Sequence, residues 1–210
     1  MKVLVIGASG RVGQKLTSKL LEADHQVVGT TRKDEKLFEA NNYSQIALDL
    51  EKSAEDLSSE IPSGVEAVYF VSGSRGKDLL NVDLHGAIKS MQAAEMAGIK
   101  RFVMLSTIYS LQPTAWDTSA DLYDYMIAKH YADQWLIKNT DLDYTILQPG
   151  SLTENAGTGE VELKVQEHGE NPIEDVAEVL FGLLDLKSSF KEVISMRSGD
   201  TPIKNALANL

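Results

Sequence analysis

The chain has 210 residues, no cysteine and a formal net charge of −11, and 43% of its residues are hydrophobic. This length suits one domain, which we expect to span residues 1–210, and the lack of cysteine excludes disulfides, thiolate nucleophiles and cysteine-ligated metals. The negative charge argues against nucleic acid or an anionic membrane as a partner, and no apolar run approaches the roughly 20 residues of a membrane helix, so we expect a cytoplasmic globular protein.

Short apolar, β-branched runs alternate with longer amphipathic stretches along the chain. The short runs predict strands over residues 2–6, 26–31, 45–48, 67–71, 101–106, 144–147 and 192–196. The amphipathic stretches predict helices over residues 11–22, 79–98, 120–139 and 174–186. This alternation is typical of a doubly wound α/β fold, in which helices flank both faces of a parallel sheet. Residues 51–60 are expected to be a solvated acidic surface, and residues 151–171 a flap over the edge of the sheet.

A glycine-rich turn joins the first predicted strand to the first predicted helix. The sequence GASGRVG has the spacing G-x-x-G-x-x-G, which differs from the G-x-G-x-x-G of the usual dinucleotide fingerprint. Missing side chains permit a tight turn and allow backbone N–H groups at a helix N-terminus to approach a pyrophosphate. A plain structural turn is the alternative, but the place of the turn in an α/β chain favours a cofactor cradle. Its residues are Gly7, Ser9, Gly10, Arg11, Val12 and Gly13.

The end of the second predicted strand bears on which nucleotide is bound. In NAD-specific folds an acidic residue here bonds the ribose 2′-hydroxyl, whereas an arginine accommodates the 2′-phosphate of NADP. The sequence VVGTTRK has no acid and ends in Arg32 and Lys33, which favours NADP(H) over NAD(H), with a solvated basic turn as the alternative. Asp49 and its neighbour Leu50, at the end of the third predicted strand, are expected near the adenine ring; a surface acid is the alternative.

Four motifs occur in order on successive predicted elements: GASGRVG, RFVMLST, YMIAK and LDYTILQPGSLT. Together they resemble the short-chain dehydrogenase/reductase superfamily, and most closely its small atypical NAD(P)-binding members, which are related to NmrA-like and epimerase/dehydratase-like proteins. The resemblance extends to the segments PIEDVAEVL and SGDTPIKNAL and so covers nearly the whole chain. It implies a Rossmann-like sheet with NADP(H) across the carboxyl ends of the strands. It also implies an active site of Asn, Ser or Thr, Tyr and Lys.

Tyr125 and Lys129 match the Tyr and Lys of that site, and Lys129 is also expected to bind the cofactor. Their spacing of four places both on one helix face, although such pairs also occur on many surface helices. The resemblance implies that Tyr125 moves a proton and that the neighbouring ammonium favours its phenolate. Thr107 would hold the substrate oxygen, and Ser106 would bond backbone or cofactor; strand-end capping is the alternative for both.

The resemblance places further residues at the site, and one of them departs from the family pattern. Asp83 stands where the family has Asn, three residues before Gly86. An added negative charge there would raise the pKa of Tyr125 unless Lys129 offsets it. Ser72, Gly73, Pro149, Gly150 and Leu152 are expected beside the cofactor, with residues 149–153 meeting the nicotinamide and Gln148 replacing an arginine that many relatives carry.

Two functions remain open from the sequence. One is an NADP(H)-dependent oxidoreductase that transfers hydride between the nicotinamide and a small carbonyl or alcohol substrate. The other is a non-catalytic NADP(H)-binding sensor resembling NmrA, which would act through a protein partner. The Tyr-x-x-x-Lys pair and Thr107 favour the enzyme, whereas Asp83 and a short C-terminal portion favour the sensor or a very small substrate. The four histidines lack metal-ligand spacing, so no metal is expected, and Trp116 is expected in packing or as a pocket wall.

Overall fold

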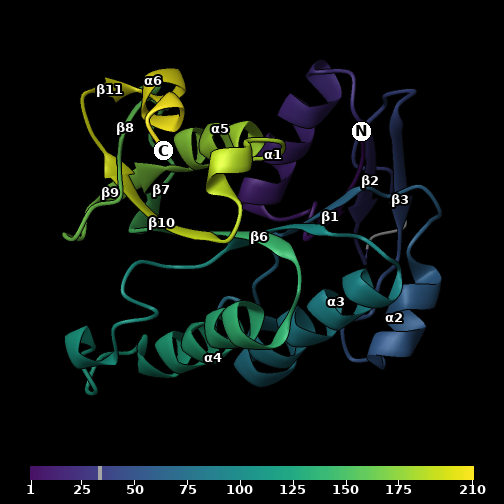
Figure 1. The fold of residues 1–210 in the computed structure, drawn as a ribbon, viewed down its shortest axis with the longest axis horizontal. Helices are drawn as coiled ribbons and strands as arrows, with labels where there is room; N and C mark the ends of the chain where they lie inside the picture. Colours follow the sequence, from purple (N-terminus) through teal and green to yellow (C-terminus); the bar gives the residue numbers. More distant parts are fainter. Residues whose placement is uncertain (33–34) are drawn as a thin grey trace.

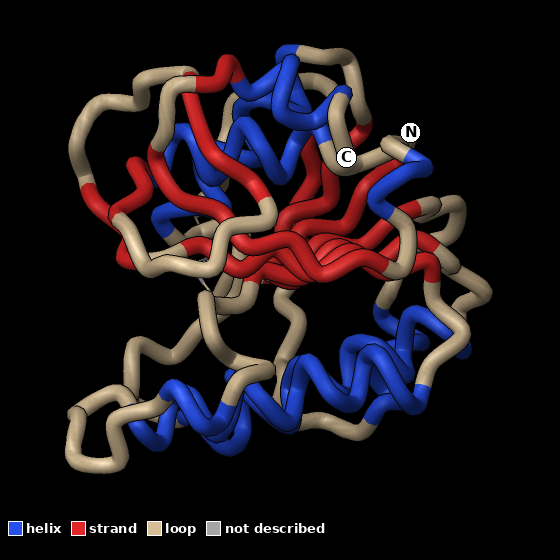
Figure 2. Tube along the Cα trace, turned by 60° about the vertical axis from the view of Figure 1, so that its left-hand side comes forward, coloured by secondary structure: helices blue, strands red, loops and turns tan. Residues whose placement is uncertain are grey.

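The centre of the molecule is a mostly parallel sheet between two layers of helices (Figures 1 and 2). The computed structural model describes residues 1–32 and 35–210, within which nine strands pair in the order β11-β8-β10-β6-β5-β4-β1-β2-β3. The parallel part consists of β1 (Lys2–Ile6), β2 (Gln26–Thr30), β3 (Tyr43–Ile46), β4 (Ala67–Phe70), β5 (Arg101–Leu105), β6 (Asp143–Pro149) and β10 (Glu192–Ser198). From β1 the chain adds β2 and β3 on one side, and then β4, β5 and β6 on the other side. The point between β1 and β4 is therefore the topological switch point, where ligands bind in doubly wound folds.

Each face of the sheet has its own helical layer and its own core. Helices α1 (Arg11–Glu22), α5 (Ile173–Gly182) and α6 (Ile203–Ala208) cover one face, and α2 (Ala54–Glu60), α3 (His85–Met96) and α4 (Tyr123–Asn139) cover the other (Figure 1). Val3 and Val5 of β1 belong to the first core, whereas Leu4 and Ile6 belong to the second. Because alternate residues of one strand enter opposite cores, the strand is buried on both sides, and the predicted doubly wound α/β fold is confirmed.

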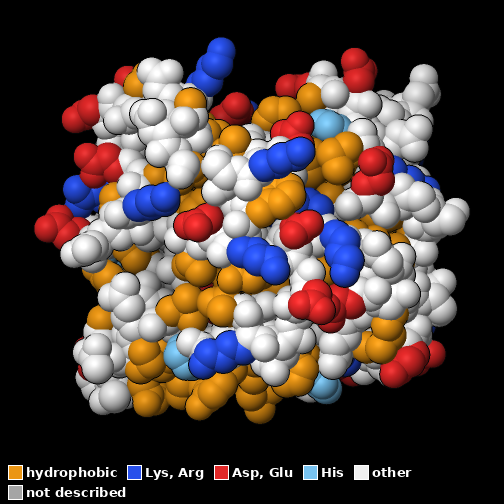
Figure 3. Space-filling model, viewed as in Figure 1, with side chains coloured by type: hydrophobic (Ala, Val, Ile, Leu, Met, Phe, Trp, Pro, Cys, Tyr) orange, Lys and Arg blue, Asp and Glu red, His pale blue; other side chains and the backbone are white. Residues whose placement is uncertain are grey.

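The two helical layers differ at the surface. In Figure 3 hydrophobic side chains gather along the lower part of the molecule, where Figure 1 places α4, and charged side chains are denser in the upper half. Ion pairs join α1 to α5, from Lys15 to Glu174 and from Lys19 to Glu178.

In the described part of the chain, no helix is long and apolar enough to cross a membrane.

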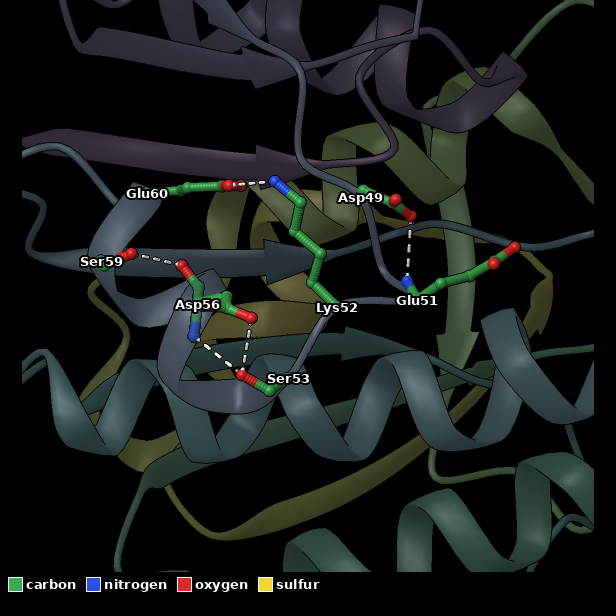
Figure 4. Close-up of polar contacts among 7 residues, drawn as sticks. All are labelled: Asp49, Glu51, Lys52, Ser53, Asp56, Ser59 and Glu60. Atoms are coloured by element: carbon green, nitrogen blue, oxygen red, sulfur yellow. Dashed lines mark hydrogen bonds and ion pairs between the residues drawn. The ribbon is translucent and has the colours of Figure 1, made fainter.

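The segment 51–60, predicted to be a solvated acidic surface, contains the short surface helix α2 (Ala54–Glu60). The Ser53 hydroxyl accepts a hydrogen bond of 3.1 Å from the Asp56 N–H and so caps α2, while Lys52 pairs with Glu60 across the helix (Figure 4). Leu57 is 1% exposed and anchors the helix against the sheet. The acidic side chains of this segment remain mostly exposed, as expected; the helix itself was not predicted, and one buried leucine with a serine cap is enough to fix it.

Other element boundaries also differ from those predicted. The third strand lies two residues earlier than expected, and α4 begins three residues later, at Tyr123. The helix expected over residues 79–98 is split into a π-helical turn, η1 (Leu79–Leu84), and α3.

The expected flap at residues 151–171 is largely built into sheets. Strand β8 (Glu160–Leu163) joins the main sheet antiparallel to β10, and β11 (Thr201–Pro202) extends it. Strands β7 (Ser151–Thr153) and β9 (Glu170–Pro172) pair with each other as a second, parallel sheet. Val161 is fully buried in the core, which explains why β8 is held within the sheet, between β10 and β11, and does not lie over it.

Candidate functional site

The glycine turn after β1 brings three segments into backbone contact. Gly7 has a φ of +97°, and a Cβ on it would lie 2.7 Å from the backbone N and Cα of Ser72, beyond β4. A Cβ on Gly13 would overlap the Gly7 carbonyl. The Gly10 N–H donates to that same carbonyl at 2.9 Å, and Gly10 is the N-cap residue of α1, without a side chain to cap it. Glycine is therefore required sterically at Gly7 and Gly13, and the α1 N-terminus faces the carboxyl ends of β1 and β4.

Other predicted cradle residues surround this N-terminus. Val12 is buried at 5% exposure, and the Ser9 carbonyl accepts a 3.0 Å bond from the Gln14 amide. Arg11 is half-exposed and its guanidinium pairs at 2.9 Å with Glu154, which follows β7. An anion bound at the helix N-terminus could pair with the Arg11 guanidinium, for which it would compete with the Glu154 carboxylate.

Of the polar residues at the end of β2, Thr30 supports the glycine turn and Arg32 is exposed to solvent. The Thr30 hydroxyl accepts a hydrogen bond of 3.1 Å from the Gly7 N–H and so fixes the glycine turn. Arg32 is exposed, and no described residue forms a hydrogen bond or ion pair with its guanidinium. Lys33 lies outside the described residues. Arg32 therefore remains a candidate for a phosphate near the cradle.

The residues after β3 are partly structural. Asp49 is exposed and its carboxylate accepts a 3.0 Å bond from the Glu51 N–H (Figure 4). It lies in the loop after β3 and not at the end of that strand. Leu50 packs against the start of α3, because a Cβ on Gly86 would lie 3.1 Å from the Leu50 Cβ. Contact of either residue with adenine stays a prediction.

Helix α4 presents Tyr125, Lys129 and Asp133 at successive turns of one face, and we call these three residues the α4 cluster. Lys129 is 3% exposed, and its ammonium donates a 2.8 Å hydrogen bond to the carbonyl of Leu105, the last residue of β5. The same Nζ lies 5.9 Å from the centroid of the Tyr125 ring. Lys129 therefore ties α4 to the strand end that carries Thr107.

The electrostatic balance around Tyr125 differs from the expectation that Lys129 favours its phenolate. Burial raises the pKa of Tyr125 above its usual value, and the charges of Asp83 and Asp133 raise it further. Burial also lowers the pKa of Lys129, against the opposing effect of the same two carboxylates. Desolvation and two nearby negative charges outweigh one ammonium. Tyr125 is therefore a neutral phenol at ordinary pH.

Asp83, at the family's Asn position, is buried beside the loop after β4. It is 1% exposed, and its Oδ2 accepts a 2.9 Å bond from the Ser74 N–H. A Cβ on Gly73 would lie 3.3 Å from Asp83 Oδ1. The structure thus brings Asp83 together with the predicted segment of Ser72 and Gly73.

Two hydroxyl residues, Ser106 and Thr107, follow β5, and only the Ser106 hydroxyl is hydrogen-bonded to a described residue. The Ser106 hydroxyl donates a 2.7 Å bond to the Asp133 carboxylate, so the expectation of a backbone or cofactor bond does not describe this structure. Ser106 points into the protein because the buried carboxylate needs donors. Thr107 is half-buried, and its hydroxyl forms no hydrogen bond with a described residue.

The loop after β6 turns tightly at the edge of the site. Pro149 ends β6, and a Cβ on Gly150 would overlap the Gly169 carbonyl, so only glycine fits there. Leu152 lies in β7, half-buried and in register with Asn171 of β9. Contact of Pro149, Gly150 and Leu152 with the nicotinamide stays a prediction.

The loop between β5 and α4, which carries Thr107, packs against α4 and against a neighbouring segment. The Trp116 indole N–H donates a 2.7 Å bond to the Tyr109 carbonyl, and its ring packs edge-on to His130 at 5.3 Å. The Tyr109 hydroxyl in turn donates to the Gln166 carbonyl at 3.0 Å, which joins this loop to the segment between β8 and β9. Trp116 therefore packs between the loop and α4.

Sequence reasoning missed the polar group that lies beneath these residues. Asp133 is fully buried, and its Oδ2 accepts bonds from Ser106 at 2.7 Å, Ser110 at 2.6 Å and the Gln148 amide at 3.1 Å. The available signal was its position four residues after Lys129 on the same helix face. The described residues offer no group of three or more His, Asp or Glu side chains suited to a metal ion.

Comparisons with known proteins place this geometry in a family. A family model described as NAD(P)H-binding matches residues 7–187. The chain belongs to this NAD(P)H-binding family. The uncharacterized sugar epimerase YhfK of Bacillus subtilis (strain 168) is 38% identical, over 100% of both chains. The crystal structure of the oxidoreductase ylbE from Lactococcus lactis is 45% identical, with a TM-score of 0.95 over 100% of this chain and 96% of that chain.

A third relative is a protein of Bacillus halodurans, provisionally named an NAD-dependent epimerase/dehydratase. Its structure is 33% identical, with a TM-score of 0.91, and all of both chains is covered. The predicted resemblance to small Rossmann-like oxidoreductases and epimerases is thereby confirmed. The cradle also fits a dinucleotide, because the glycines leave backbone space at an uncapped helix N-terminus.

Proposed function

We propose that the protein is an NADP(H)-dependent oxidoreductase that transfers hydride between the nicotinamide and a small carbonyl or alcohol substrate. The observation that carries this proposal is the hydrogen bond of Lys129 to Leu105, because it brings Tyr125 of α4 beside the strand end that carries the unengaged Thr107 hydroxyl. When bound, the nicotinamide supplies or accepts the hydride.

The side chains then have separate roles in the direction of reduction. Thr107 donates a hydrogen bond that holds the substrate oxygen. Tyr125, which is neutral because its pKa is raised, donates its proton to that oxygen as the carbonyl carbon gains hydride. The product is an alcohol, and the phenolate left on Tyr125 regains a proton from water. The raised pKa keeps Tyr125 protonated but makes it a weaker acid, so its proton moves only as negative charge develops on the substrate oxygen, which is a stronger base than the phenolate.

The preference for NADP(H) rests on Arg32. Its exposed guanidinium follows β2, beside the strand end whose Thr30 supports the glycine turn. Arginine pairs bidentately with phosphate oxygens, and Arg32 would bind the 2′-phosphate in this way. With a net charge of −11, the protein is expected to act on a small molecule and not on nucleic acid or a membrane.

The test is a reductase assay with NADPH and a panel of small aldehydes, ketones and keto sugars, followed by loss of reduced nicotinamide absorbance. We expect turnover with at least one class of carbonyl. The sugar epimerase named among the relatives suggests a control, in which product analysis detects epimerised sugar without net cofactor oxidation. No chemical change in any substrate, with cofactor still bound, would contradict the enzyme assignment.

A second candidate is a cofactor-dependent sensor that acts through a protein partner. Asp83 favours it, because the family's Asn position here carries a buried carboxylate bonded to the Ser74 N–H. In that case NADP(H) would bind without turnover, and replacing Tyr125 with Phe would leave partner binding unchanged.

A further inference from the structure

Asp133 connects the segments that carry the candidate catalytic residues. Ser106 and Ser110, whose hydroxyls both bond Asp133 Oδ2, flank Thr107 in the loop after β5. Gln148, the third donor, comes directly before Pro149 in β6. A single oxygen atom on α4 therefore fixes the Thr107 loop and the end of β6 relative to the helix of Tyr125 and Lys129.

A purely structural anchor would not require a charge at this position. Asp133 is fully buried, and its second oxygen, Oδ1, has no hydrogen-bond partner among the described residues. A buried carboxylate with an unpaired oxygen costs free energy unless a nearby cation compensates it. Burial raises the pKa of Asp133, and Lys129, one helical turn away, is the cation that opposes this shift; the hydrogen bond of Lys129 goes to the neutral Leu105 carbonyl.

We propose that Asp133 is a positioning residue of the active site, which orients the Thr107 loop through its Oδ2 and balances the Lys129 ammonium through its charge. This inference rests on the proposed oxidoreductase function. The titratable groups around it are Lys129 and Tyr125 of α4, and Asp83 of η1 acts on the same two side chains. His130 lies nearby, with Nδ1 2.8 Å from the Ser110 carbonyl. The other groups bonded to Asp133 are neutral.

The charge and the hydrogen bonds can be separated by mutation. Asp133→Asn keeps the size of the side chain and removes the charge, and Ser110→Ala removes one donor and keeps the charge. Because the carboxylate raises the pKa of Lys129, its loss should lower that pKa. We expect the alkaline limb of the kcat profile to move down by about 1 pH unit in Asp133→Asn. Ser110→Ala should lower kcat without moving the profile.

A readout without turnover keeps this test separate from the proposed function. NMR of lysines labelled at Cε, with Lys129→Met to assign the signal, should show the Lys129 transition about 1 pH unit lower in Asp133→Asn. NADPH affinity should not change, which shows that the variant is folded. An unmoved Lys129 transition would overturn the charge role even if no substrate is ever found.

Should Asp133→Asn fail to fold, Asp133→Glu separates the same two contributions by keeping the charge and changing the hydrogen bonds. It keeps the charge and disturbs the hydrogen-bond geometry, so kcat should fall while the Lys129 transition stays at its original pH. A Glu variant whose transition moves as far down as that expected for Asn would contradict the proposal.

Discussion

In the glycine turn the fit is between backbone atoms, whereas in the α4 cluster it is between buried polar side chains. Gly7 and Gly13 are required because any Cβ would meet the backbone of Ser72 or of Gly7 itself. Tyr125, Lys129 and Asp133 instead depend on desolvation and on one another's charges. The difference teaches that the cradle should be sensitive chiefly to added volume, whereas the cluster should also be sensitive to the loss of a single charge or hydroxyl.

The largest effect is expected at Tyr125. Tyr125→Phe keeps the volume and removes the hydroxyl, so kcat should fall by about 10²–10⁴-fold while cofactor affinity stays unchanged. Tyr131→Phe is the matched control, because Tyr131 lies on the same helix and is 58% exposed. Steady-state kinetics of both variants checks the prediction. Equal activity in Tyr125→Phe and Tyr131→Phe would show that Tyr125 does not move the proton.

Next comes a change of volume in the cradle. Gly13→Ala should lower the free energy of unfolding by about 3 kcal/mol, because the methyl group meets the fixed Gly7 carbonyl. Gly10→Ala should cost about 1 kcal/mol or less, since its Cβ would be 3.2 Å from the same oxygen. Urea denaturation measures both. If the two variants were equally stable, the steric account of the turn would fail.

Arg32 is expected to contribute to the affinity for NADPH and not to the affinity for NADH. Arg32→Ala should weaken NADPH binding by about 1.5–3 kcal/mol, roughly 10- to 100-fold in Kd, and leave NADH binding nearly unchanged. Calorimetry with each nucleotide gives the comparison, with Arg75→Ala as a control arginine on another loop. Equal losses for NADPH and NADH would exclude a 2′-phosphate contact.

The smallest effect concerns the ion pair of Arg11 with Glu154. Both side chains are well exposed, so Glu154→Gln should change the free energy of unfolding by less than about 1 kcal/mol. It should also tighten binding of the dinucleotide slightly at low salt, because Arg11 no longer has a competing carboxylate. A clear loss of affinity in this variant would instead indicate that the pair shapes the cradle.

The same contrast explains how much could be predicted from sequence. Strand β1, helix α1 and the glycine positions were predicted correctly because their signal lies within one short stretch of apolar periodicity and small residues. Tyr125 and Lys129 were singled out by the family resemblance together with their spacing on one helix, and their catalytic roles stay a prediction. The doubly wound fold class followed from the alternation of strands and helices, whereas the strand order was not predicted.

What was missed depends on contacts between distant parts of the chain. Asp133 bonds Ser106 and Gln148, which lie 27 and 15 residues away, so its role is visible only after folding. Strand β8 was missed because its partner, β10, follows much later in the chain. The raising effect of Asp83 on the pKa of Tyr125 was expected, but the larger effect of burial and the contribution of Asp133 depend on the folded structure.

The most direct test of the account is a fluorescence titration of the purified protein with NADPH, NADP⁺, NADH and NAD⁺, one at a time. We predict saturable binding of all four to the glycine cradle, with the two phosphorylated nucleotides bound more tightly because of Arg32. Binding of none of the four would contradict the cofactor site and, with it, every role assigned to the α4 cluster.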